Sequence, residues 1–337
     1  MKTDSRRRRG NILLPLILAL VALLRVYPYV EAQTVPAPTA STSQPAPFPS
    51  QLRKTVIFID VLCWDGANQI DVQGTGFIVV MPDDRLGKDR GFGYLVTNRH
   101  MAEPSLGLNR PVSVLNTALR INLKTPTPDG RQAGALNLGP NVPWRFSPDL
   151  SVDLAVVPFM PDISVFDFLT IPVSLFATKD VVTSRGVGEG DSVVLAGYFA
   201  QFPGMKKVQP IVREGMLAMM PDEDIRTTLG APGHLYLADV HTFHGNSGSP
   251  VFVNLGGLRG GNMIVGTDYK LLDVVSGFFP ESADLKIQAA ATLIGTVEGN
   301  SNVTTIVPVD EIKAILESRE LSQMRDQVIA SLAPSSH

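Results

Sequence analysis

The sequence contains a single cysteine, Cys63, among its 337 residues. One thiol cannot form an intrachain disulfide framework or a thiolate metal cluster. An excess of charge of one sign is also missing, since 29 Lys and Arg residues face 32 Asp and Glu residues, for a formal net charge of −3. A nucleic-acid-binding protein should carry a basic face, so this balance argues against that class. The fold must therefore be stabilised by its core, for which this length is ample.

Long hydrophobic runs are scarce as well. The apolar stretch Ile12–Leu24 has thirteen residues, interrupted only by Pro15, whereas a membrane-spanning helix needs about 20. It follows the basic run Arg6–Arg9 and precedes residues 30–32, which carry small residues at the −3 and −1 positions of a cleavage site. This layout predicts a secretory signal peptide over residues 1–32. The alternative is an uncleaved membrane anchor, the one way in which we expect the protein to contact a membrane.

Charge is absent from Gln33–Ser50, which is composed largely of Pro, Ala, Ser and Thr. Such a composition cannot bury enough apolar surface to order itself, so we expect a semi-extended linker over residues 33–52. An exported protein with one cysteine is more typical of bacteria than of animals, whose small secreted domains depend on disulfides. We therefore expect a bacterial protein that is secreted or periplasmic.

Helical periodicity is weak between Lys54 and Pro308. Apolar residues come instead in runs of four to nine, rich in Val, Ile and Phe and separated by Gly, Pro, Asp and Asn. Short strands at this spacing are typical of β-barrels and β-sandwiches. The main helical pattern follows Pro308, at Val309, Ile312, Ile315 and Leu316. The sequence thus predicts an all-β fold with a C-terminal helix, followed by a C-terminal tail over residues 321–337 that either extends the helix or is loose.

The histidines do not have the spacing of a metal site. His241 and His244 are three residues apart, in a segment that we interpret as a strand entering a loop. Residues three apart on a strand point to opposite faces, so these two imidazoles would not converge on one ion. We expect no metal site and no cofactor.

Ser247 lies in the segment Gly245–Pro250, GNSGSP, between two apolar runs. Flanking glycines allow a tight turn that exposes the hydroxyl and points backbone N–H groups outward, as a nucleophilic serine requires. Taken alone, the segment favours an ordinary Gly/Ser/Asn turn over a nucleophile. Two other segments favour the nucleophile: His100 follows the apolar run 95–97, and Asp153 precedes the apolar run 154–157.

In these segments the sequence resembles the trypsin/chymotrypsin-like serine peptidases, and within that family the bacterial members that have few disulfides. The order His, Asp, Ser along the chain is that of the chymotrypsin arrangement and differs from the subtilisin and α/β-hydrolase orders. Six segments carry the resemblance in order, with Arg99 departing from the usual small or polar residue: Gly74–Val79, Thr97–His100, Asp153–Val156, Gly245–Pro250, Leu271–Phe279 and Asn302–Leu316.

The resemblance implies two antiparallel six-stranded β-barrels in a domain over residues 53–320, the first about 53–175 and the second about 176–308. The cleft between them would hold Ser247 as nucleophile, His100 as general base and Asp153 as the residue that orients the imidazole. The amides of Gly245 and Ser247 would form the oxyanion hole. Asp149 is a rival acid, but no apolar run follows it to bury it.

The resemblance also implies a peptide-binding edge. Ser276, Gly277 and Phe278 would pair with an extended peptide. The residues near the specificity pocket would be His241 and Thr242, with Asn302 opposite. Because no aspartate falls at the base of that pocket, we expect small or apolar P1 residues rather than Arg or Lys. We further expect the segments 221–232 and 280–291 to be loops over the cleft.

Asn246 occupies the position at which pancreatic-type relatives carry an aspartate that pairs with a newly cleaved N-terminus. An asparagine is uncharged, and no matching activation site occurs near residue 54. We therefore expect a monomeric, secreted serine endopeptidase that acts on protein or peptide substrates without such activation. Two alternatives remain: a peptide-binding protein that has the fold without catalysis, and a serine esterase with the same residues.

Overall fold

The computed structural model describes residues 26–28, 48–259, 262–288 and 292–332. Most of the expected signal peptide (1–32) and linker (33–52) therefore lies outside the described residues. Val26–Pro28 forms β1, antiparallel to residues 90–92. Within the described ranges, no helix has the length and apolar character needed to cross a membrane.

The first half of the chain forms one sheet with the strand order β6-β5-β2-β3-β4-β8-β7. Six of its strands have four or more residues: β2 (Val56–Trp64), β3 (Gln69–Pro82), β4 (Arg90–Thr97), β5 (Ser113–Asn122), β6 (Ala133–Gly139) and β8 (Ala155–Pro158). The short strands β1, β7 (Arg145–Phe146) and β9 (Ile171–Pro172) raise the count to nine. The six longer strands match the number expected for this half, and the three short strands pair with them as additions.

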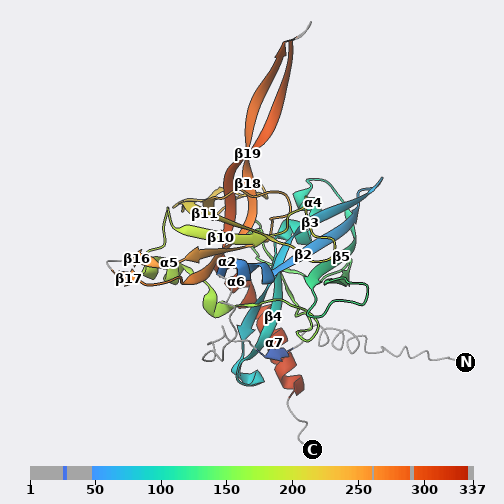
Figure 1. Ribbon diagram of the computed structural model, residues 1–337, viewed down its shortest axis with the longest axis vertical. Helices are drawn as coiled ribbons and strands as arrows, with labels where there is room; N and C mark the ends of the chain where they lie inside the picture. The colour runs from blue at the N-terminus through green and yellow to red at the C-terminus, as the bar shows by residue number, and fades with distance from the viewer. Residues whose placement is uncertain (1–25, 29–47, 260–261, 289–291, 333–337) are drawn as a thin grey trace, which may run out of the picture.

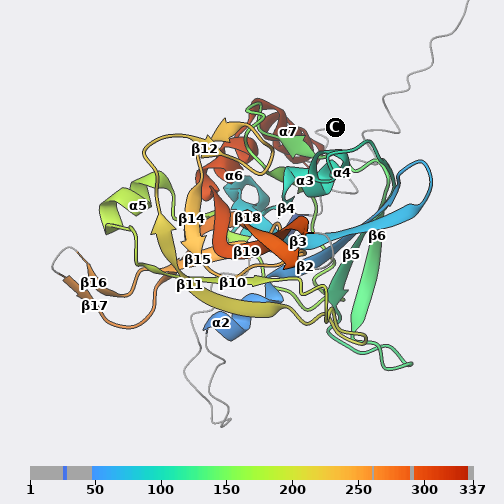
Figure 2. The same ribbon diagram turned by 90° about the horizontal axis from the view of Figure 1, so that it is seen from above.

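The second half forms a closed antiparallel barrel of six strands in the order β10-β11-β14-β19-β18-β15. These strands are β10 (Ser192–Gly197), β11 (Ile211–Met219), β14 (Tyr236–Asp239), β15 (Pro250–Asn254), β18 (Tyr269–Gln288) and β19 (Thr292–Pro308). Two small hairpins extend from it: β12 (Ile225–Arg226) with β13 (Pro232–Gly233), and β16 (Gly257–Arg259) with β17 (Asn262–Ile264). The predicted all-β fold and this second barrel are confirmed, and Figure 2 shows the strands of the two halves side by side.

In the part of the chain that the structure describes, helices are few and mostly short. They are α2 (Phe48–Gln51), α3 (Arg99–Ala102), α4 (Pro104–Gly107), α5 (Lys179–Arg185), α6 (Val309–Leu316) and α7 (Arg319–Leu332), with 3-10 turns at Leu52–Lys54, Asp84–Leu86 and Val173–Leu175. The predicted C-terminal helix is α6. Of the two alternatives for the residues after Leu321, a helix extension or a loose tail, residues 321–332 are helical: they lie in α7, in which Leu321, Met324 and Val328 recur at helical spacing and are buried.

The end of the expected linker packs on the second barrel. The ring of Phe48 stacks on Tyr269 with centroids 4.2 Å apart and meets Phe252 edge-on at 5.5 Å. Leu52 is almost fully buried. The chain is therefore fixed to the body from residue 48 onward.

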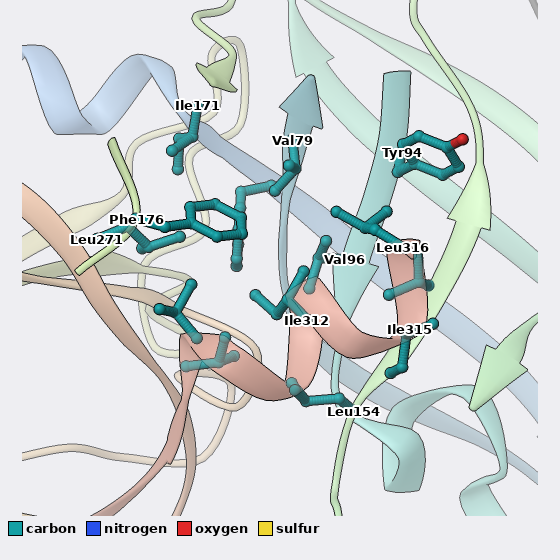
Figure 3. Packing of buried hydrophobic residues seen from close by; sticks show 14 of the residues in the cluster. Val79, Tyr94, Val96, Leu154, Ile171, Phe176, Leu271, Ile312, Ile315 and Leu316 are labelled. Atoms are coloured by element: carbon teal, nitrogen blue, oxygen red, sulfur yellow. The ribbon is translucent and has the colours of Figure 1, made fainter. Parts of the chain in front are cut away.

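The core joins the two halves through α6. Ile312, Ile315 and Leu316 are buried in one cluster with residues of β3, β4, β8 and β18 (Figure 3). Full burial of each such side chain contributes about 2 kcal/mol. A helix at the end of the chain thus fixes the first sheet against the second barrel, and with them the two sides of the cleft. Cys63 is buried in the first sheet, as expected of a small apolar residue.

The segment 280–291 is not the loop over the cleft that the sequence suggested. The strands β18 and β19 continue through most of it and pair from Pro280–Asn300 to Gln288–Thr292. They form a two-stranded ribbon that projects away from the body of the molecule (Figure 1). Residues 289–291 lie outside the described residues.

Asp273 in β18 is a fully buried carboxyl whose two oxygens have no hydrogen-bond partner in the described part of the chain. It pairs across the sheet with Val251, which lies in the core of the second barrel. Burial, assisted by the negative charge of Asp310, raises the pKa of Asp273 well above its usual value. Asp273 therefore stays neutral in the folded protein at pH values at which its carboxyl is already ionised in the unfolded chain.

We expect Asp273→Val to raise the free energy of unfolding at pH 8 by roughly 1–3 kcal/mol. Because the folded pKa is raised, ionisation of Asp273 contributes nothing to the difference in stability below its unfolded pKa of about 4. The destabilisation that it causes grows as pH rises from there toward the folded pKa. Denaturant unfolding at pH 4, 6 and 8 tests this, with Asp273→Asn as the variant that removes only the charge. If the gain in the free energy of unfolding of Asp273→Val did not grow with pH, this prediction would be contradicted.

Candidate active site

His100 and Asp153 meet because their strands are neighbours. β4 and β8 pair antiparallel, with Thr97 opposite Ala155, so the end of β4 lies beside the start of β8. His100 lies in α3 directly after β4, and its Nδ1 is 2.8 Å from Asp153 Oδ2. The backbone N–H of His100 donates to Asp153 Oδ1 at 3.0 Å. Since an ionised carboxylate only accepts, Nδ1 carries the proton and Nε2 keeps the lone pair that a general base needs.

The surroundings of His100 act on its pKa in opposite directions. Burial disfavours the charged imidazolium, but the charge and the hydrogen bond of Asp153 outweigh it and raise the pKa of His100 above its usual 6.5. The imidazolium is thus stabilised, as it must be once the histidine has taken a proton.

Asp153 itself is fully buried and well supplied with donors. Besides the two groups of His100, Ser276 Oγ donates to Asp153 Oδ2 at 2.6 Å. The amide of Asn98 donates to the backbone carbonyl of Asp153 at 2.8 Å. The rival acid Asp149 lies in an exposed turn and accepts from the N–H of Ser151. Of the two acids, the structure brings Asp153 to the imidazole.

Ser247 lies in a turn whose glycines have positive φ, 95° at Gly245 and 82° at Gly248. Its side chain faces the same cavity as His100, a space of about 200 Å³. Ser247 Oγ lies 3.5 Å from the carbonyl oxygen of Ser276 and makes no hydrogen bond to His100 in the described chain. Catalytic hydrogen bonds are often long without substrate and tighten in the complex.

The amides of Gly245 and Ser247 donate no hydrogen bond within the part of the chain that the structure describes. Their carbonyls, in contrast, are fixed by one residue of β3. Thr75 Oγ1 donates to Gly245 O at 2.8 Å, and the Thr75 N–H donates to Ser247 O at 2.8 Å. The turn is therefore held by its carbonyls, while two neighbouring N–H groups stay available for an oxyanion.

Thr75 is a positioning residue that the sequence analysis missed. It is fully buried, and its hydroxyl also accepts the N–H of Tyr198 at 2.8 Å, so it connects the first sheet, the end of β10 and the Ser247 turn. The available signal was a hydroxyl residue between two glycines in an otherwise apolar run, Gly74–Val79. A hydroxyl residue in a buried run must find hydrogen-bond partners inside the protein.

We expect Thr75→Val to lower kcat about tenfold to a hundredfold with little change in KM, because the oxyanion donors lose their support. Thr75→Ser keeps the hydroxyl and should stay within a few-fold of the original. Steady-state kinetics on one peptide substrate measures both. Equal losses in the two variants would show that the methyl group, and not the hydroxyl, matters.

Asn246 is buried beside this turn and uses both ends of its amide. Its Oδ1 accepts from the N–H of Phe243 at 2.9 Å, and its Nδ2 donates to the carbonyl of Tyr198 at 2.7 Å. All these partners are backbone groups, and none is charged. The side chain thus fixes the loop before Ser247 without an ion pair.

The cavity wall includes several residues predicted to bind substrate: Thr242, Ser276, Gly277 and Phe278. His241 and Asn302 are not among the described lining residues. The ring of His241 packs on Phe243 with centroids 4.4 Å apart, and Asn302 is exposed. Six lining residues were not predicted as site residues: Gly107, Thr228, Leu229, Phe243, His244 and Val275. Thr228 and Leu229 come from the segment 221–232, which forms the β12–β13 hairpin.

Thr242, expected from the sequence near the specificity pocket, has its Oγ1 2.8 Å from Thr304 Oγ1. Thr304 donates its hydroxyl proton to the carbonyl of Val240 at 2.6 Å, so Thr242 must be the donor between the two threonines. Both hydroxyl protons are therefore already used. This pair of threonines offers neither a carboxylate for a basic side chain nor a free donor for an acidic one.

No family model matches the sequence, and no curated protein matches it. Among solved structures the chain is similar to Deg5, with 14% identity and a TM-score of 0.42 over 78% of this chain and 88% of that chain. It is also similar to the HtrA-type protease AlgW with a tripeptide, at 14% identity and TM-score 0.41 over 80% of this chain and 64% of that one. For AlgW with a decapeptide the values are 14%, 0.42, 83% and 67%. The assignment of the fold rests on the strands described above, and the assignment of the candidate site rests on the geometry of its residues.

Proposed function

We propose that this protein is a serine endopeptidase with Ser247, His100 and Asp153 as its catalytic residues. The observation that carries the proposal is the combination, around one cavity, of a part-buried imidazole bound to a buried carboxylate, a serine in a glycine-flanked turn, and two N–H groups that donate to no acceptor among the described residues. A protein that only binds peptides has no chemical need for a base with a free Nε2 beside a serine. This argues against the purely binding alternative.

In the proposed mechanism, Ser247 Oγ attacks the scissile carbonyl while His100 Nε2 takes the hydroxyl proton. The carbonyl oxygen becomes an oxyanion held by the amides of Gly245 and Ser247. His100 then returns the proton to the leaving amine, and an acyl-enzyme remains on Ser247. Water repeats the sequence to release the acid, and Asp153 stabilises the imidazolium in each half-reaction.

The substrate side of the proposal is a peptide that binds in extended form along Ser276–Phe278. The pocket base formed by Thr242 and Thr304 favours a neutral, small or apolar P1 side chain, because it offers no charge and no free hydroxyl proton. We propose export for the same protein, on the basic and apolar pattern of residues 1–32, and action as a monomer.

A fluorogenic peptide library, read out by mass spectrometry of the products, tests this function. We expect cleavage after small or apolar residues, lost in Ser247→Ala. An ethyl ester and an amide of the same acyl group, assayed side by side, separate the esterase alternative. Turnover of the ester with no detectable amide hydrolysis would replace peptidase by esterase.

A further inference from the structure

The β12–β13 hairpin belongs to the second half of the chain but packs on the first, next to the catalytic acid. Its tip is closed by two backbone hydrogen bonds, Thr227 N–H to Ala231 O at 2.8 Å and Gly230 N–H to Thr227 O at 2.9 Å. At its base, a Cβ on Gly233 would lie only 2.6 Å from Ser151 Oγ. The hairpin backbone therefore lies directly against the segment that leads to Asp153.

Thr228, at the tip, reaches the catalytic carboxylate. Its Oγ1 donates to Asp153 Oδ2 at 3.2 Å and lies 2.7 Å from Ser276 Oγ. Ser276 has one hydroxyl proton, and the shorter contact of 2.6 Å commits it to Asp153. Thr228 also has a single hydroxyl proton, which it shares between Ser276 Oγ at 2.7 Å and Asp153 Oδ2 at 3.2 Å, so the two hydroxyls and Oδ2, the atom that holds His100 Nδ1, form a hydrogen-bonded triangle.

The methyl group of Thr228 is placed as closely as its hydroxyl. A Cβ on Gly277 would lie 2.6 Å from Thr228 Cγ2, so the tip packs on the bare backbone of the strand that would bind substrate. Thr228 also lines the cavity together with His100. One side chain of the hairpin thus contacts both the acid and the substrate edge, and this fixes its position from two sides.

We propose that Thr228 is a positioning residue for catalysis: it holds Asp153 and Ser276 in place and through them orients His100. The inference rests on the proposed function. Hydrogen bonds to a charged carboxylate are stronger than neutral ones, and a network of three hydroxyl and carboxylate groups loses geometry when one member is removed. The imidazole of His100 is then correctly oriented only when the β12–β13 hairpin is in place.

The test replaces the hydroxyl at nearly constant volume. Thr228→Val should lower kcat about tenfold with KM within about twofold, since one hydrogen bond to a charged group is lost. Thr228→Ser restores the hydroxyl and should recover most of kcat. Thr227→Val, the same change at the preceding residue of the hairpin, is the matched control: the Thr227 hydroxyl makes no hydrogen bond within the described residues and does not line the cavity, so the His100–Asp153 geometry should stay intact.

A second readout does not depend on turnover. The proton on His100 Nδ1, shared with Asp153, gives a far-downfield proton NMR signal, and we expect it to shift or broaden in Thr228→Val but to stay in place in Thr228→Ser and Thr227→Val. A Thr228→Val protein with unchanged kcat and an unchanged signal would overturn the inference. If the original protein shows no turnover but its signal responds as described, the proposed function fails and the positioning role stands.

Gly277 provides an independent route to the same contact. Gly277→Ala introduces a methyl group against Thr228 Cγ2 and should displace the tip, with a loss of kcat similar to that of Thr228→Val. In the double variant Thr228→Ser Gly277→Ala the opposing methyl is gone, so kcat should rise again above that of Gly277→Ala alone. Absence of any such rescue would contradict the role assigned to the hairpin tip.

Discussion

Asp153→Asn should lower kcat about 10⁴-fold while leaving KM within a few-fold. The asparagine amide cannot accept from His100 Nδ1, from the His100 N–H and from Ser276 Oγ as the carboxylate does, so it turns its NH₂ toward one of them. The imidazole then carries its proton on the wrong nitrogen and cannot take the proton of Ser247. Steady-state kinetics with a peptide substrate measures the loss.

The matched control for this variant is Asp149→Asn. Asp149 lies four residues earlier on an exposed turn and accepts from Ser151 rather than from His100. We expect its replacement to leave kcat within about twofold, as for most surface changes. Equal losses in the two variants would mean that Asp153 is not the orienting acid.

The pH dependence gives a second view of the same pair. Because Asp153 raises the pKa of His100 against the opposing effect of burial, the acid limb of kcat/KM should lie above pH 6.5. In Asp153→Asn the stabilising charge is gone while burial remains, so the residual activity should show this limb at lower pH. A limb that moves upward, or does not move, would contradict the assigned contact.

Asn246→Asp is the second variant with a large expected effect, a fall in kcat of about a hundredfold or more. The carboxylate replaces the Nδ2 donor that lies 2.7 Å from the carbonyl of Tyr198, so two oxygens would face each other. The site is buried and none of its described partners is a cation, which makes a charge there costly. The turn must open to relieve this, and the oxyanion donors of Gly245 and Ser247 move with it.

Kinetics and thermal unfolding measure the two consequences of Asn246→Asp. Asn137→Asp, on the exposed face of β6, is the control for the same chemical change without burial. We expect the control to keep its activity and its melting temperature. An Asn246→Asp protein with full activity would show that an N-terminal or other cation reaches this site, contrary to the interpretation of Asn246 as a neutral support.

Part of the site could be predicted because it follows from strand ends. His100 directly follows a buried strand and Asp153 precedes another, and Thr97 pairs with Ala155, so the contact needs only that these two strands be neighbours. The second barrel and α6 could likewise be predicted from short apolar runs and from the spacing of Val309, Ile312 and Ile315.

The missed features depend on contacts between distant segments. Thr228 lies in a polar turn, and nothing in its local sequence indicates that the hairpin packs on the other half of the molecule. Thr75 had a local signal, a hydroxyl residue in a buried run, but its partners lie 123 and 170 residues away. The segment 280–291 was predicted to be a loop, although apolar residues alternate at 283, 285 and 287 as in a strand.

The central claim is that Ser247 is an activated nucleophile, and reaction with a fluorophosphonate probe tests it most directly. The probe reports on the serine itself and needs no knowledge of the substrate. We predict one label, mapped to Ser247 by mass spectrometry, absent in Ser247→Ala and slowed in His100→Ala. A folded protein that takes no label, or takes it at another residue, would contradict the account.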